Sequence, residues 1–136
     1  MSREAVDVVR KSFDAWNRGD IESFVALYHS DCEWGFTHFD GWPEEGTYAG
    51  HSGLRRLFEQ WLSAWEDFHV EAEEVGPVGD DRVLMQARTF SRGKGSGAYV
   101  ESPPFWQLCT LREGKLLRVV NYTDRAEALE AAGLSE

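Results

Sequence analysis

Two alternating segments near the end of the chain, Phe105–Arg112 and Leu116–Thr123, are joined by a tight Arg-Glu-Gly-Lys turn. Successive side chains of a strand point to opposite faces, so this pattern predicts a β-hairpin. One face of the hairpin holds two amides, Gln107 and Asn121, among apolar neighbours. Amides in an otherwise apolar face predict the floor of a pocket.

The first half of the chain repeats its apolar residues at helical spacing. We expect a helix from Ser2 to Gly19, a short helix after Asp20 and a third from about Ser52 to Trp65. Asp20 can cap the second helix, and Gly19 can end the first.

Beyond Phe68 the apolar period changes from 3.6 to 2, which predicts strands. The order predicts an α+β fold in which a curved, mostly antiparallel sheet packs against three N-terminal helices and a short C-terminal helix follows. We expect Tyr28–Asp31 to be a turn, and a strand over Cys32–His38. Asp124 and Gly133 fit the two ends of the last helix. We expect one domain over residues 1–136.

Composition excludes several classes of partner. The chain has 14 basic and 24 acidic residues and a net charge of −10, which repels a phosphate backbone, so we expect no nucleic acid partner. It contains no apolar run long enough to cross a bilayer and no signal-like N-terminus, so we expect no membrane and a cytoplasmic location. Cys32 and Cys109 lack a CxxC spacing and are expected to be buried free thiols.

The other face of the predicted sheet is also apolar. Its residues are too hydrophobic to face water as one patch; they are Leu84, Phe90, Trp106, Leu108, Val120 and Tyr122. A homodimer that stacks this convex face on its copy is the simplest explanation, and local cover by loops is the alternative.

No cofactor or metal site is expected. The segment Gly93–Gly97 lacks the order of a Walker loop, because Lys94 is followed by glycine, and reads as a hairpin end. The histidines and carboxylates are scattered over different elements without a ligand spacing.

Four segments resemble the SnoaL-like branch of the nuclear-transport-factor-2-like superfamily. They are Asn17-Arg-Gly-Asp-Ile-Glu22, Tyr48-Ala-Gly-His-Ser-Gly-Leu54, Leu111-Arg-Glu-Gly-Lys115 and Tyr122-Thr-Asp-Arg-Ala-Glu-Ala-Leu129. The resemblance implies a cone-shaped domain whose curved sheet wraps a pocket closed by helices. Such domains include polyketide cyclases, steroid isomerases, epoxide hydrolases and dehydratases, so the fold alone does not choose a function.

The resemblance also implies which side chains point into the cone. His38 and Gln107 are the candidate catalytic residues, and the expected ligand-binding residues are Ser12, Trp16, Trp34, Phe36, Cys109, Val119, Asn121 and Thr123.

Three positions depart from the ketosteroid isomerases. The resemblance places Ser12 where those enzymes have a tyrosine, Phe36 where they have the general-base aspartate, and Gln107 where they have a protonated acid. An isomerase of that type needs a carboxylate to move a proton, so its chemistry is disfavoured. Polyketide cyclases of the SnoaL kind similarly rely on an acid that Gln107 cannot replace.

The residues leave three functions open. The first is binding of a small, largely apolar, oxygen-bearing molecule, with Gln107 and Asn121 as donors unless these amides merely satisfy each other. The second is a cofactor-independent cyclase, isomerase or dehydratase in which His38 is the acid or base, unless His38 is a solvated strand-end residue. The third is a non-catalytic dimeric interaction module whose cone is filled by its own side chains.

Overall fold

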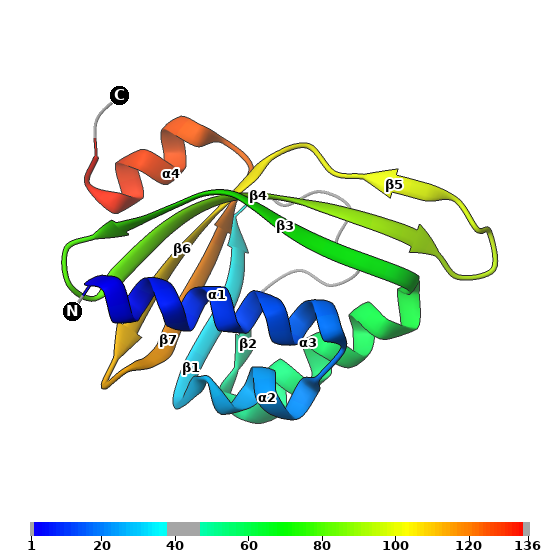
Figure 1. Cartoon of the computed structure of the whole chain (residues 1–136), viewed down its shortest axis with the longest axis horizontal. Helices are drawn as coiled ribbons and strands as arrows, with labels where there is room; N and C mark the ends of the chain where they lie inside the picture. Colours follow the sequence, from blue (N-terminus) through cyan, green and yellow to red (C-terminus); the bar gives the residue numbers. More distant parts are fainter. Residues whose placement is uncertain (1, 38–46, 135–136) are drawn as a thin grey trace.

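The computed structural model describes residues 2–37 and 47–134. Three helices lie on one face of a curved sheet and a fourth lies apart from them (Figure 1). The helices are α1 (Ser2–Arg18), α2 (Ile21–Ala26), α3 (Gly50–Ala64) and α4 (Arg125–Ala132). The strands are β1 (Tyr28–Thr37), β2 (Thr47–Ala49), β3 (Trp65–Val78), β4 (Arg82–Gly93), β5 (Tyr99–Glu101), β6 (Phe105–Arg112) and β7 (Lys115–Tyr122).

These strands form one mixed sheet in the order β2-β1-β7-β6-β4-β3, with β5 paired to β4. Only the β1–β7 pairing is parallel among the described strands, and the other pairs are antiparallel. The α+β fold with a mostly antiparallel sheet, three N-terminal helices and a short last helix is therefore confirmed.

The predicted start of the second helix and both ends of the last helix are also confirmed. The Asp20 side chain accepts a hydrogen bond from the Ser23 backbone N–H at the start of α2, and Asp124 does the same for Ala126 at the start of α4. Gly133 ends α4 with a φ of 78°, a left-handed conformation that favours glycine.

Three local predictions were wrong. Tyr28–Asp31, expected to be a turn, belongs to β1, because Tyr28 pairs with Leu116 of β7 across the parallel ladder. Trp65, expected to extend the third helix, has extended backbone angles and begins β3. The short strand β2 was not predicted. Pairing between distant segments decided each of these cases.

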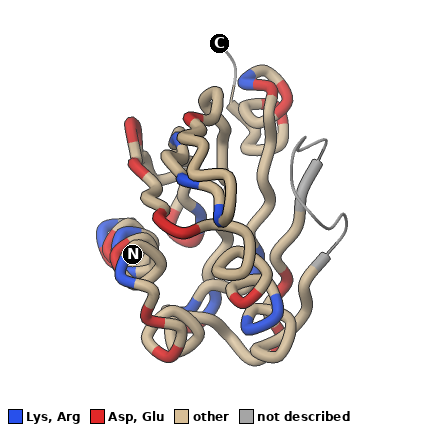
Figure 2. The backbone as a smooth tube through the Cα atoms, turned by 90° about the vertical axis from the view of Figure 1, so that its right-hand side faces the viewer, with Lys and Arg blue, Asp and Glu red and all other residues tan. Residues whose placement is uncertain are grey.

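The core lies between the helices and the concave face of the sheet. On β4 the alternation is regular, and Val83, Met85 and Ala87 are all buried. The charged residues of α1 gather on the outer side of the helix (Figure 2). Its buried side chains include Val9 and Trp16, which belong to the hydrophobic core. Apolar burial thus fastens α1 to the sheet.

Part of the opposite, convex face is covered from within the chain. Helix α4 packs on β6 and β7 through its buried residues Ala128 and Ala132. Leu108, on this face, is 8% exposed. The remaining apolar residues, which include Phe90, Val120 and Tyr122, are half-buried.

A pair of hydrogen bonds links α1 to the edge strand β3. The Asn17 amide nitrogen donates to the Val70 carbonyl at 2.9 Å, and the Val70 N–H donates to the Asn17 Oδ1 at 2.7 Å. The Asn17 side chain thus takes the place of a neighbouring strand and satisfies both the backbone N–H and the carbonyl of Val70.

We expect Asn17→Ala to lower the free energy of unfolding by about 2 kcal/mol, because it leaves a partly buried donor and acceptor without these partners. Urea denaturation measures the change. The control is Ser63→Ala, which removes an exposed hydrogen bond within α3 and is expected to cost less than about 0.5 kcal/mol. Equal losses in the two variants would contradict the assigned role of Asn17.

Candidate functional site

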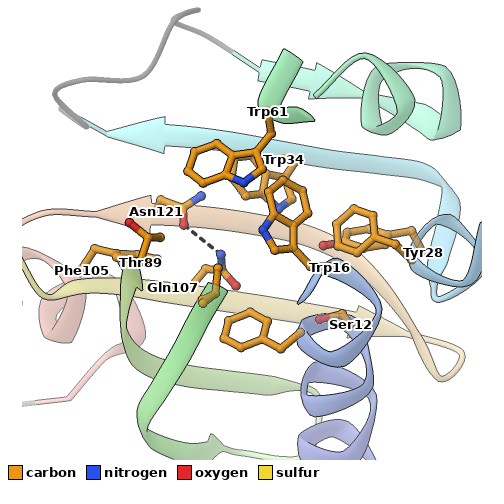
Figure 3. A pocket seen from close by; sticks show the side chains of 12 residues that line it. Ser12, Trp16, Tyr28, Trp34, Trp61, Thr89, Phe105, Gln107 and Asn121 are labelled. Carbon is orange, nitrogen blue, oxygen red and sulfur yellow. Dashed lines mark hydrogen bonds between the residues drawn. The ribbon is translucent and has the colours of Figure 1, made fainter. Parts of the chain in front are cut away.

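A cavity lies between the concave face of the sheet and helices α1 and α3. It offers about 70 Å³ to the centres of water-sized spheres. Three tryptophans, Trp16, Trp34 and Trp61, converge on it from α1, β1 and α3 (Figure 3). The rest of the described lining is also mainly apolar: Phe13, Phe24, Tyr28, Val70 and Phe105.

The cavity floor is polar, as the hairpin pattern predicted. Gln107 and Asn121 are 8% and 1% exposed and both line the cavity. The Gln107 amide nitrogen donates to the Asn121 Oδ1 at 2.9 Å, and the Asn121 amide nitrogen donates to the Gly35 carbonyl at 3.0 Å. This chain of bonds joins β6, β7 and β1, while each amide nitrogen keeps a second hydrogen.

Ser12 and Thr89 are the other polar residues of the described lining. The Ser12 hydroxyl donates to the Val9 carbonyl one turn earlier, at 2.6 Å. Its proton therefore already has an acceptor within α1. Its oxygen still has acceptor capacity.

The Trp16 indole nitrogen is buried and has no hydrogen-bond partner in the part of the chain that the structure describes. Trp16 is 7% exposed. In Figure 3 its nitrogen lies on the side of the ring turned toward Gln107 and Asn121. A buried N–H without a partner costs free energy, so this group favours an acceptor brought in from outside.

Tyr28 is the only ionisable residue in the described lining. Burial raises its pKa well above the usual value, although a hydrogen bond with the Trp34 side chain opposes the shift. The hydroxyl therefore stays protonated at neutral pH. The described wall is uncharged and contains no group that exchanges a proton near pH 7.

The predicted site residues divide into three groups. Five of them meet at the cavity: Ser12, Trp16, Trp34, Gln107 and Asn121. Cys109 and Val119 are buried at 1% exposure but are not in its described lining, and Thr123 follows the end of β7 and is exposed. His38 and the side chain of Phe36 lie outside what the structure describes, although the Phe36 backbone pairs with Asn121.

Sequence reasoning missed several lining residues. Thr89 and Val70 lie on strands whose alternation turns them inward. The alternating pattern of the sequence could therefore have predicted both as lining residues. Tyr28 was missed because it was assigned to a turn.

No group of three or more histidine, cysteine or acidic side chains in the described residues could hold a metal ion. Among those residues, no helix is long and apolar enough to cross a membrane.

The comparisons with known proteins agree with this architecture. The profile of the SnoaL-like domain matches residues 9–119. The chain belongs to the SnoaL-like family. A search of curated proteins found no match.

Solved structures share the fold at low sequence identity. TerC, co-crystallised with polyporic acid, is 21% identical, with a TM-score of 0.77 over 96% of this chain and 98% of TerC. A proposed SnoaL-like polyketide cyclase from Jannaschia sp. is 19% identical, with a TM-score of 0.74 over 99% and 95%. A protein with a ketosteroid isomerase-like fold from Catenulispora acidiphila, in complex with trimethylamine, is 18% identical, with a TM-score of 0.74 over 94% and 93%. The SnoaL-like chain therefore has the nuclear-transport-factor-2-like fold.

The burial of the Cys109 thiol, next to Gln107 of the cavity floor, can be tested through the pH dependence of stability. The thiol lies 3.7 Å from the Gln107 Oε1, and burial raises its pKa from 9.0 to about 12. The folded protein thus keeps this proton at pH values where the unfolded chain releases it, so stability falls as the pH rises above about 9.

We expect the free energy of unfolding to fall by about 2 kcal/mol more in the natural protein than in Cys109→Ala between pH 8 and pH 10.5, at about 1.4 kcal/mol for each pH unit above 9. Urea denaturation at the two pH values measures both losses. Groups that do not interact with Cys109 cancel in the comparison. An identical pH dependence would show that the thiol is not buried as described.

Proposed function

We propose that this SnoaL-like protein is a cytoplasmic, single-domain binder of small, neutral organic molecules that carry a hydrogen-bond acceptor. The observation that carries the proposal is the buried N–H of Trp16 at the cavity, which has no hydrogen-bond partner among the described residues. A carbonyl or ether oxygen of a ligand would supply the acceptor, and the aromatic wall would cover its apolar part.

The charge of the lining supports a neutral ligand. A buried ion needs a partner of opposite charge, and the described wall contains none. Two structurally similar proteins were solved with small organic molecules, polyporic acid in one and trimethylamine in the other, which supports small-molecule binding but not the charge of the ligand.

The size of the cavity limits the ligand. An apolar cavity of about 150 Å³ holds benzene, and this one has about 70 Å³. In the conformation described, the ligand is therefore a molecule of few heavy atoms.

Binding is proposed ahead of catalysis because the described wall lacks an acid or base that works near neutral pH. In an isomerase, cyclase or dehydratase of this fold, His38 would move the proton and Gln107 would hold the developing oxyanion. The other sequence-derived residues, Phe36, Cys109, Val119 and Thr123, would then support the site rather than the reaction.

We expect the protein to bind cyclopentanone about tenfold more tightly than its hydrocarbon isostere methylenecyclopentane, since only the ketone accepts the Trp16 hydrogen bond. Replacement of Trp16 by 3-benzothienylalanine keeps the ring shape and removes the N–H, and should reduce the preference to less than about threefold. Calorimetric titration measures both affinities.

The matched control is the same replacement at Trp65, which packs on Trp61 and does not belong to the described lining. It should leave the preference unchanged. Tighter binding of tetramethylammonium than of cyclopentanone would contradict a neutral, acceptor-bearing ligand and favour a cation held by aromatic rings.

We also propose a homodimer through the part of the convex face that α4 leaves half-buried. Sedimentation velocity should give a dimer for the natural protein and a monomer for Val120→Asp, because an unpaired carboxylate would be buried at the contact. Leu62→Asp, at an exposed site on α3, should remain dimeric. A natural protein that sediments as a monomer would contradict the dimer.

A further inference from the structure

A second opening lies directly behind the wall of the cavity. A cleft of about 250 Å³ runs along the surface between α1 and β3. Phe13 and Val70 line both this cleft and the interior cavity, and they are the only described residues common to the two linings. These two side chains therefore form the partition between the interior and the surface.

The two residues of the partition, Val70 and Phe13, differ in conformational freedom. Val70 is held by Asn17 through both its backbone carbonyl and its backbone N–H, at 2.9 Å and 2.7 Å, and its β-branched side chain has few rotamers. Phe13 is half-buried and has an apolar ring on two rotatable bonds. Phe13 is thus the part that can move while α1 stays attached to the sheet.

Moving this ring would change the size of the site. The 70 Å³ of the cavity and the 250 Å³ of the cleft together make about 320 Å³. Sites for drug-sized ligands begin at about 300 Å³. Displacement of one side chain would therefore convert a space for very small molecules into an ordinary ligand site.

The two ends of the combined chamber differ in their polar groups. Its inner end holds the Trp16 N–H and the amide pair, its middle is apolar, and its outer rim carries Arg10, Asp14 and Glu71. One guanidinium and two carboxylates at the exposed rim accommodate a polar outer end of the ligand.

We infer that Phe13 is a gate and the size-determining residue of the site: ligands enter through the α1–β3 cleft and displace its ring. The inference rests on the proposed function and adds the ligand class, an elongated and mainly apolar molecule with an acceptor at its inner end and a polar group at its outer end.

The test uses three ketones of increasing size: cyclopentanone, acetophenone and 2-acetylnaphthalene. Phe13→Ala should bind 2-acetylnaphthalene at least about tenfold more tightly than the natural protein, because the ring no longer has to be displaced. Its affinity for cyclopentanone, the smallest of the three and the one that displaces the ring least, should change less than about threefold. Stopped-flow tryptophan fluorescence should show about tenfold faster association of acetophenone.

Phe90→Ala is the matched control, because it removes the same side chain from a half-buried position outside both linings. Phe13→Leu, a milder truncation, should show the same trend if Phe13→Ala fails to fold. Unchanged size selectivity in the Phe13 variants, with cyclopentanone still bound, would overturn the gate and leave the proposed function standing. Equal gains in Phe90→Ala would also overturn it. Absence of binding by every protein to every ketone would overturn both proposals.

Discussion

The packing of Trp16 determines how the helices are held on the sheet. Its ring centroid lies 5.3 Å from Phe24 of α2, 4.6 Å from Phe58 and 5.7 Å from Trp61 of α3, and 6.0 Å from Phe68 of β3. One side chain therefore contacts both other N-terminal helices and the edge strand. Large rings pack without filling every space between them, and the cavity is located beside this contact. The fold and the candidate site thus depend on the same side chain.

The polar floor complements this aromatic wall. A run of hydrogen bonds from Gln107 through Asn121 to the Gly35 carbonyl ties three strands together beneath the cavity. Because the amides already have partners in the sheet, they are satisfied without a ligand and keep their positions when one arrives. Trp16 differs, since its N–H gains a partner only from outside the described residues. We therefore propose that the aromatic wall recognises the ligand and that the amide floor keeps the site rigid.

Local signals predicted those parts of the structure that are locally determined. Asp20 and Asp124 cap the starts of their helices through side-chain hydrogen bonds to nearby backbone N–H groups, and Gly133 ends α4 in a left-handed conformation. The inward positions of Gln107 and Asn121 follow from alternation alone. Tyr28 was misassigned because its strand exists only through pairing with β7, a segment almost ninety residues away. Phe13 was not predicted as a site residue. It lies between the interior cavity and the surface cleft, and no local sequence pattern shows that these two spaces are adjacent. The resemblance to the SnoaL-like family predicted the overall fold, which the structure shares.

The most direct test of the central claim observes the Trp16 N–H itself. In a ¹H–¹⁵N spectrum the six tryptophans give six indole signals, and the one lost in Trp16→Phe belongs to Trp16. Addition of cyclopentanone should move that signal downfield and slow its exchange with solvent, whereas methylenecyclopentane should produce neither change. A Trp16 signal that stays in place while cyclopentanone binds would contradict the account, because the ligand would then be held without the donor on which the site is argued to depend.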